Sequence, residues 1–237
     1  MSKSTTRSYL RTAIAIVMLA IMLFPLYWMV NASLQASGNT LNATLFPTDV
    51  SLDGYRVAIQ DQGRNLVTSL IIAAGTVIMT LAVATPAAYA LAQFRFRWVG
   101  IALLLILITQ MIPGIVIANG LYSVYESLGL LNSIPGLIIA NSTAAIPFAI
   151  LIMRSFMIGV PPSIVEAARV DGAGLFRSFI SIVVPIARNS LITAGLFTFL
   201  FAWSDFLFAL TLTTKGDVRP VTLGIYTYLG SQVQNWG

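Results

Sequence analysis

Long runs of residues without a charged side chain dominate this sequence. Four of them cover residues 12–30, 65–94, 99–119 and 134–153, and a fifth, 189–214, holds a single charge at Asp205. About 20 consecutive apolar residues are enough for a helix to cross the ~30 Å hydrocarbon core of a bilayer. The five runs therefore predict an all-α, polytopic transmembrane protein with five spans.

Composition supports a membrane protein and removes most enzymatic chemistry. Of the 237 residues, 57% are hydrophobic and 9% are charged, and the mean hydropathy is +0.87. In an ordinary soluble domain about one quarter of the residues are charged. The chain has no cysteine and no histidine, which excludes disulfides, thiol nucleophiles and the commonest metal and proton-transfer ligands. We therefore predict no catalytic site, no metal site and no enzymatic activity in this chain.

The basic residues are distributed unevenly between the two sides that this layout defines. One side carries nine of them, Lys3, Arg7, Arg11, Arg95, Arg97, Arg154, Arg169, Arg177 and Arg188, and the other carries Arg56, Arg64, Lys215 and Arg219. Because cytoplasmic loops are enriched in Lys and Arg, the amino terminus is predicted to be cytoplasmic. The basic residues form no stripe, so the net charge of +5 reflects topology and not nucleic-acid binding.

This topology divides the chain into three parts. Residues 1–11 form a basic cytoplasmic amino terminus. Residues 12–214 form a transmembrane domain with a cytoplasmic loop at 154–188, and residues 215–237 form a polar extracytoplasmic segment. The first apolar run is longer than the about 7–15 residues of a signal peptide, so we interpret it as a retained span.

The last cytoplasmic loop contains the segment EAARVDGAGLFRSFISIVVP, residues 166–185. Ser163, followed three residues later by Glu166, predicts a capping box that starts a short helix. Gly172 is well placed to be the left-handed residue that ends this helix. A second short segment over 175–185 would complete a helix, a turn and a helix.

The segment resembles the EAA loop of the membrane subunits of bacterial ABC importers, in Glu166, Ala167, Ala168, Asp171, Gly172, Ala173 and Pro185. The stretches 52–59 and 201–206 are similar to segments of the carbohydrate-uptake group, whose members resemble the maltose-type permeases. The resemblance covers nearly all of the chain. It implies a type I permease fold and a subunit that moves a sugar or related solute by ATP-driven alternating access.

In that family the loop docks into a groove of an ATPase subunit. The resemblance therefore implies coupling roles for Ser163, Glu166, Ala167, Ala168, Arg169, Asp171 and Gly172. Two adjacent alanines make a thin helix surface for a close partner, and Glu166 and Arg169 can engage a polar cleft. The alternative is that Glu166 only caps its own helix and the glycine only turns the chain.

Partners follow from the same resemblance. The chain has no G-x-x-x-x-G-K-S/T segment, so it cannot hold nucleotide phosphates itself. ATP and Mg²⁺ are expected in partner ATPase subunits, two of them by the family pattern. A second homologous permease subunit and an extracytoplasmic solute-binding protein are also implied, at the bacterial cytoplasmic membrane and in contact with its lipid.

Two polar sites inside the apolar runs are candidates for the substrate path. Asn141 begins three consecutive polar residues, which should face protein or water because unsatisfied polar groups in hydrocarbon cost several kcal/mol each. Helix-to-helix packing is an equally open role for them. Asp205 follows Trp203 by two residues in the segment similar to sugar permeases, about 24 Å along a helix that starts at residue 189. A carboxylate at this depth marks either a pathway or a structural pairing.

Two alternatives concern the whole chain. A secondary transporter or channel would move solute without ATP and use Asp205 as an ion or proton site, but it leaves the EAA pattern unexplained. The family pattern also has a sixth span after residue 214, where this sequence is polar. The missing span has two explanations under this resemblance. Either the sequence is truncated, or the protein is a naturally short member whose carboxyl terminus is extracytoplasmic.

Overall fold

The computed structural model describes residues 2–35, 44–46, 49–94, 97–216 and 218–230. Its elements in this part of the chain are helices, which confirms the all-α prediction. In order they are α1 (Ser2–Ser33), α2 (Asp53–Gln93), α3 (Val99–Thr109), α4 (Gly114–Leu128), α5 (Ile134–Met157), α6 (Pro162–Val170), α7 (Leu175–Ser178), a π-helix (Phe179–Val183), α8 (Val184–Ile186), α9 (Arg188–Trp203), α10 (Leu207–Leu212) and α11 (Val221–Gly230). Arg95, which is assigned to the cytoplasmic side above, lies outside the described residues.

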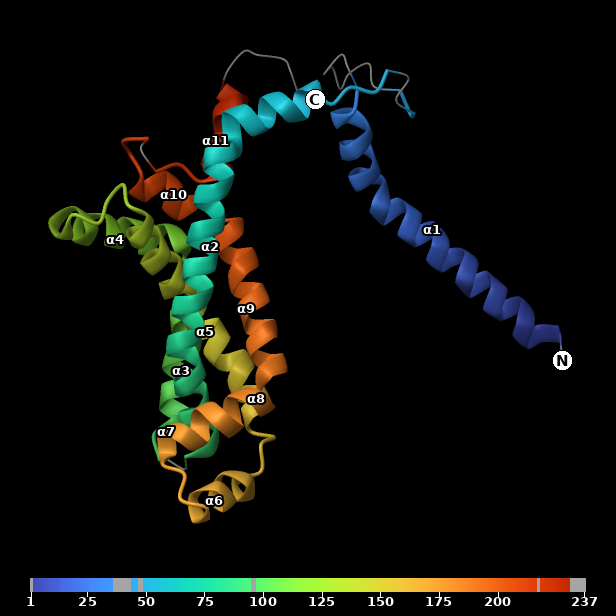
Figure 1. The fold of residues 1–237 in the computed structure, drawn as a ribbon. Coiled ribbons are helices and arrows are strands. Elements are labelled where there is room, and N and C mark those ends of the chain that lie inside the picture. Colours follow the sequence, from blue (N-terminus) through green and yellow to red (C-terminus); the bar gives the residue numbers. More distant parts are fainter. Residues whose placement is uncertain (1, 36–43, 47–48, 95–96, 217, 231–237) are drawn as a thin grey trace. The chain divides into compact units, whose positions relative to one another are not determined.

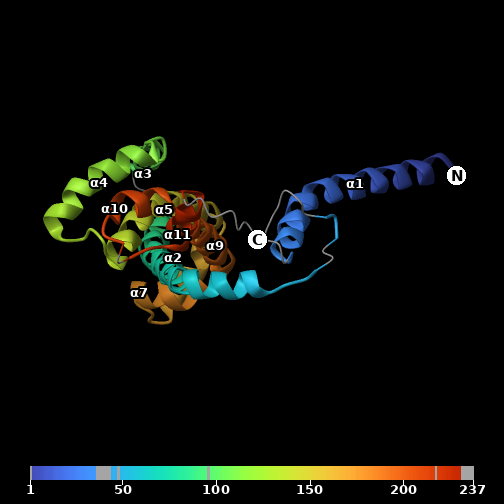
Figure 2. The same ribbon diagram turned by 90° about the horizontal axis from the view of Figure 1, so that it is seen from above.

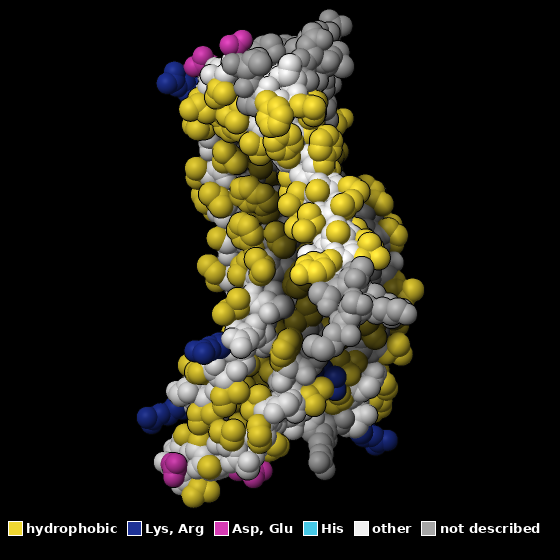
Figure 3. Space-filling view, turned by 90° about the vertical axis from the view of Figure 1, so that its right-hand side faces the viewer, with side chains coloured by type: hydrophobic (Ala, Val, Ile, Leu, Met, Phe, Trp, Pro, Cys, Tyr) yellow, Lys and Arg dark blue, Asp and Glu magenta, His cyan; other side chains and the backbone are white. Residues whose placement is uncertain are grey.

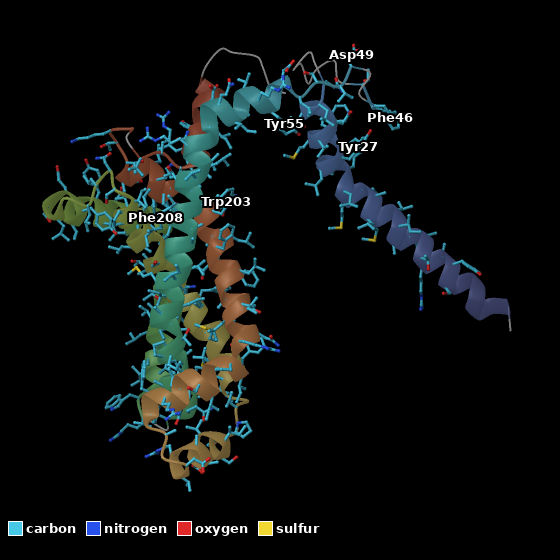
Figure 4. The ribbon with its side chains drawn as sticks, viewed as in Figure 1. Tyr27, Phe46, Asp49, Tyr55, Trp203 and Phe208 are labelled. Atoms are coloured by element: carbon cyan, nitrogen blue, oxygen red, sulfur yellow. The ribbon has the colours of Figure 1, made fainter. Side chains whose placement is uncertain are left out.

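The chain divides into two compact units, Arg64–Thr227 and Met1–Gly63 with Tyr228–Gly237. In the unit that contains Met1–Gly63, helix α1 exposes large apolar side chains around its whole circumference. Such a helix is typical of a membrane span. Its end is held by polar contacts: Asn31 Nδ2 donates to the Thr44 carbonyl at 2.7 Å, and the hydroxyls of Ser33 and Tyr55 lie 2.6 Å apart. Tyr55 is labelled in Figure 4.

In the unit Arg64–Thr227, helices α2, α5 and α9 run side by side (Figures 1 and 2). Small residues line their contact, where Ala88, Ala149 and Ala194 are fully buried. Gly75 of α2 lies so close to Ile138 of α5 that an added Cβ would meet the Ile138 Cδ1 atom at 2.5 Å. Small residues allow this close approach, which matters in a bilayer because lipid provides no hydrophobic force between helices.

Three of the five predicted spans are single helices. A stretch of α1, Ser8–Ser33, and the whole of α2 and α5 are each long and apolar enough to cross a membrane. Hydrophobic side chains predominate on the face drawn in Figure 3, as a lipid-covered surface requires. Counting each bent pair of helices as one span raises the number among the described residues to as many as five.

The other two predicted spans are not continuous helices, which corrects the sequence analysis. Run 99–119 is divided between α3 and α4, whose axes meet at 91°. Run 189–214 is α9, which meets the preceding segment Leu175–Ile186 at 76°, followed by a break and then α10. Figure 2 shows α4 leading away from the cluster of α2, α5 and α9.

Local chemistry explains both breaks. Pro113 lacks an N–H and disfavours helical backbone in the residue before it, and its own backbone is extended, with φ −58° and ψ 134°. After α9, Asp205 accepts hydrogen bonds from the N–H of Phe208 and Ala209 at 3.1 and 3.2 Å. These bonds start a new helix. The prediction that Asp205 lies on a single helix starting at residue 189 is therefore wrong, because that helix ends at Trp203.

The segment after residue 214, described above as polar, also contains a helix. Val221, in the first turn of α11, is buried and donates its N–H to the Ser69 hydroxyl on α2 at 2.8 Å. Thr222 Oγ1 donates to the carbonyl of Asp205 at 2.6 Å. The start of this segment is therefore not simply polar. It packs against α2 and against the break after α9.

Candidate functional site

A cavity of about 480 Å³ lies where the two helix breaks meet the polar turn of α5. Its polar wall residues are Thr109, Gln110, Asn141, Thr143 and Asp205, and its aromatic ones are Phe148, Phe201 and Phe208. Phe208 can be located on α10 in Figure 4. The volume falls in the range of about 300–1,000 Å³ that is usual for small-molecule sites. Irregular backbone at membrane depth is tolerated where it lines such a cavity.

The cavity brings together two of the three predicted path residues. Asn141 and Asp205 both line its wall, and Asn141 Nδ2 donates to the Leu137 carbonyl at 2.9 Å. Both Asp205 oxygens accept backbone N–H groups of α10. Asp205 therefore holds the start of α10 in place, and it shares the cavity wall with Asn141.

Trp203 is not part of this cavity wall. Its ring stacks on Phe199 with centroids 5.7 Å apart and an interplanar angle of 14°. The aromatic wall is instead built by Phe148 and Phe201, which meet edge to face at 5.7 Å. Sequence reasoning missed these phenylalanines and Gln110, although a polar residue shortly before Pro113 inside an apolar run is a usable sign of a break. No group of three Asp or Glu side chains comes together as metal ligands among the described residues.

The second candidate site is α6 with the turn that follows it. The predicted capping box at its start is wrong. The helix begins at Pro162, Pro161 occupies the capping position, and no side chain caps it. A proline at the first helical position has no N–H that needs a cap, and its φ already suits a helix. Because α6 begins at Pro162, Ser163 lies inside the first turn and cannot cap it.

The predicted end of α6 is confirmed. Gly172 has φ +85°, a left-handed conformation that costs other L-residues about 1–2 kcal/mol. Its N–H donates to the Arg169 carbonyl at 3.1 Å, and the Ala173 N–H donates to the Ala168 carbonyl at 2.9 Å. These two bonds form a Schellman motif, which satisfies carbonyls at the helix end. The helix, turn and helix arrangement follows, with α7 starting at Leu175.

The residues of α6 differ in what they present to a partner. Ser163, Glu166, Ala167, Arg169 and Asp171 are exposed, whereas Ala168 faces inward with 9% of its surface accessible. The thin surface predicted from two alanines is therefore open only at Ala167. Apolar side chains flank it, since Val170 is 87% and Phe176 78% exposed.

Comparison with known proteins explains why these features occur in one chain. Residues 84–235 match the family described as "Binding-protein-dependent transport system inner membrane component". The chain belongs to this family. It is thus a permease, an inner-membrane subunit of a transport system, and the resemblance drawn from the EAA loop is confirmed.

Relatives of this permease include transport subunits with named solutes. It is 35% identical to a probable ABC transporter permease of Sinorhizobium fredii over 96% of this chain and 84% of that protein. It is 30% identical to the trehalose transport system permease protein SugB of Mycobacterium tuberculosis, over 88% and 77%. It is 29% identical to the trehalose/maltose transport system permease protein MalG of Thermococcus litoralis, over 91% and 79%.

A solved structure supports the fold of the permease. A chain of a bacterial ABC transporter involved in the import of the acidic polysaccharide alginate matches 97% of this chain with a TM-score of 0.77. The match covers 81% of that chain at 22% sequence identity. The two chains therefore share an ABC importer permease fold.

Proposed function

We propose that this permease moves a sugar or related solute across the bacterial cytoplasmic membrane by ATP-driven alternating access. The observation that carries the proposal is that one packed unit has the exposed helix α6 at one end and α10 towards the other (Figure 1), and residues of α10 line the cavity. The trehalose and maltose names of two relatives support the sugar class. Aromatic rings beside amide and hydroxyl groups suit an amphipathic sugar ring.

The partners in this proposal are separate subunits. Two ATPase subunits would hold ATP and Mg²⁺ and bind the open face of α6, which consists of Ser163, Glu166, Ala167, Arg169 and Asp171. Ala168 and Gly172 would act by fixing the shape of that helix. A second homologous permease would complete the pathway, and an extracytoplasmic binding protein would deliver the solute. This arrangement requires α6 and the amino terminus to be cytoplasmic, which agrees with the excess of Lys and Arg on that side.

The mechanism follows from thermodynamic coupling. Closure of the ATPase pair would move α6, and α5 and α9, which flank the loop, would carry the movement to the cavity. An ATPase can shift the permease between two states only if it binds them with different free energies. The contact at α6 must therefore differ between the two states.

The direct test is uptake by proteoliposomes that contain the permease, its partner permease, its ATPase subunits and its binding protein. Labelled trehalose, maltose and a polyol would be offered with and without ATP on the ATPase side. We expect uptake of at least one sugar with ATP and none with a non-hydrolysable analogue. Uptake without ATP that follows an ion gradient would instead favour a secondary transporter centred on Asp205.

The cavity is proposed as part of the solute path, with Asn141 as its contact. Replacing Asn141 with leucine, of similar size, is expected to lower uptake about tenfold, because one buried hydrogen bond to the solute is worth about 1.5 kcal/mol. The amount of bound ATPase should not change. The same replacement at Asn189, which is exposed on α9 and absent from the cavity wall, is the control. Equal uptake by the two variants would remove Asn141 from the path.

A further inference from the structure

The last turn of α2 lies against both limbs of the loop that carries α6. The incoming limb, residues 154–161, is the end of α5 and the linker to α6, and the outgoing limb is residues 175–186. On the outgoing side, the rings of Tyr89 and Phe179 pack with centroids 5.3 Å apart. On the incoming side, the contacts are hydrogen bonds from side chain to backbone.

These hydrogen bonds are reciprocal. Gln93, the last residue of α2, donates from Nε2 to the carbonyls of Met157 and Val160 at 2.8 and 3.0 Å. Arg154, near the end of α5, donates from Nε to the Leu91 carbonyl at 3.1 Å. The last four carbonyls of any helix lack intrahelical donors. Arg154 supplies such a donor to the end of α2, at Leu91. Gln93 adds a second donor to the Met157 carbonyl, which also accepts the Val160 N–H at 3.2 Å, and ties the end of α5 to the linker that follows it.

Packing beneath the hydrogen bonds joins the two helix ends further. Met153 and Met157 of α5 are fully buried together with Ala88 of α2. The Thr85 hydroxyl of α2 also lies 3.7 Å from the Met153 sulfur. Interiors packed in this way transmit displacement because they have few voids to absorb it.

Both helices contain a proline that would otherwise absorb such a displacement. Pro147 lies inside α5, in the cavity wall, and Pro86 lies inside α2. A proline removes a hydrogen bond and is a usual cause of a helix kink. The two prolines do not face each other across the contact between the helices. Thr85, next to Pro86, contacts Met153, and Met153 lies six residues after Pro147 on α5. Each weak point is therefore braced by regular helix.

We propose that Gln93 and Arg154 are positioning residues that make the ends of α2 and α5 move as one body when the loop around α6 moves. Without them, packing alone would join α5 to α2, and more of the displacement would be taken up by bending of α5 at Pro147 before it reached the cavity. This inference rests on the proposed function, in which α6 binds an ATPase. It assigns these two residues a role in how much solute moves per ATP, and not in ATPase binding.

The test uses the complete transporter with Gln93→Met, which keeps the side-chain length and removes both donors. We expect normal ATPase co-purification and ATP hydrolysis, with the solute moved per ATP lowered by at least about fivefold, the factor for one typical hydrogen bond, because the two bonds of Gln93 are both lost. Gln93→Met combined with Arg154→Met should lower the ratio further. Gln93→Arg, which retains N–H donors, should restore most of it. Gln60→Met, at an exposed position on the same helix, is the matched control.

The outcomes separate this role from a structural one. An unchanged ratio of solute to ATP in the double variant would overturn the proposal. So would a fall in uptake that only follows the amount of assembled complex in thermal-stability and co-purification measurements. If the unmodified permease binds no ATPase, the proposed function of α6 fails first and the positioning role falls with it.

Discussion

Replacing Gly172 with valine is expected to abolish ATP-driven uptake while the permease remains in the membrane. A Cβ at this position would meet no atom within 4 Å, so crowding plays no part. The cost lies in the backbone, because φ is +85° and that conformation costs L-residues about 1–2 kcal/mol. A β-branched residue such as valine is expected to pay the upper part of this range. The Schellman bonds to Ala168 and Arg169 would be lost, and the exposed face of α6 would change shape. Co-purification of the ATPase subunits and uptake would measure the loss.

Gly174 provides the control for this prediction. A Cβ there also meets nothing within 4 Å, but its φ of −65° is ordinary for any residue. Gly174→Val should therefore behave as wild type. Gly172→Asn should retain most of the activity, because asparagine tolerates the left-handed conformation. If Gly172→Val still bound the ATPase and supported uptake, the end of α6 would be only a turn, and the coupling proposal would fail.

Asp205→Ala is expected to reduce uptake severely, by about tenfold or more if the start of α10 moves out of the cavity wall. Two N–H groups, those of Phe208 and Ala209, would lose their acceptor. Loss of a helix cap costs about 0.5–2 kcal/mol, and in a cavity wall this cost adds to the change of shape. Uptake and thermal unfolding in detergent should therefore fall together.

Asp205→Asn separates capping from a charge-dependent role. An asparagine side chain caps a helix nearly as well as aspartate, but its single amide oxygen can replace only one of the two acceptors that Asp205 offers to Phe208 and Ala209. This variant should therefore keep most of the uptake and stability that Asp205→Ala loses. If it instead lost uptake while remaining as stable as wild type, the carboxylate charge itself would be required. Dependence of uptake on a proton gradient would then be the next measurement, because that result would favour the ion-site alternative.

Features that depend on a few neighbouring residues were predictable. Uncharged runs of sufficient length indicated helices at α1, α2 and α5. Gly172, inside the EAA loop, indicated the left-handed end of α6, since few residues other than glycine adopt that backbone readily. The start of α6 was mispredicted because Pro162 can begin a helix without the side-chain cap that Ser163 and Glu166 suggest.

Features that depend on how helices bend and cross were not predictable. Asp205 could be recognised as an unusual intramembrane carboxylate, but its use as the start of α10 depends on where α9 stops. The 91° bend between α3 and α4 brings Gln110 to the same cavity as Phe201, far along the chain. Hydropathy carries no information about such a bend, because both helices remain apolar.

The sequence by itself determined the class of protein, the family and the end of α6 at Gly172, because hydropathy, proline and glycine act within a few residues. Only the tertiary structure decided which polar side chains share a cavity and that Trp203 lies outside it. It alone paired Gln93 with Met157, 64 positions apart. The physical reason is that a side-chain donor and a carbonyl at a helix end meet only when their helices cross at one level, and packing of the whole unit sets that level.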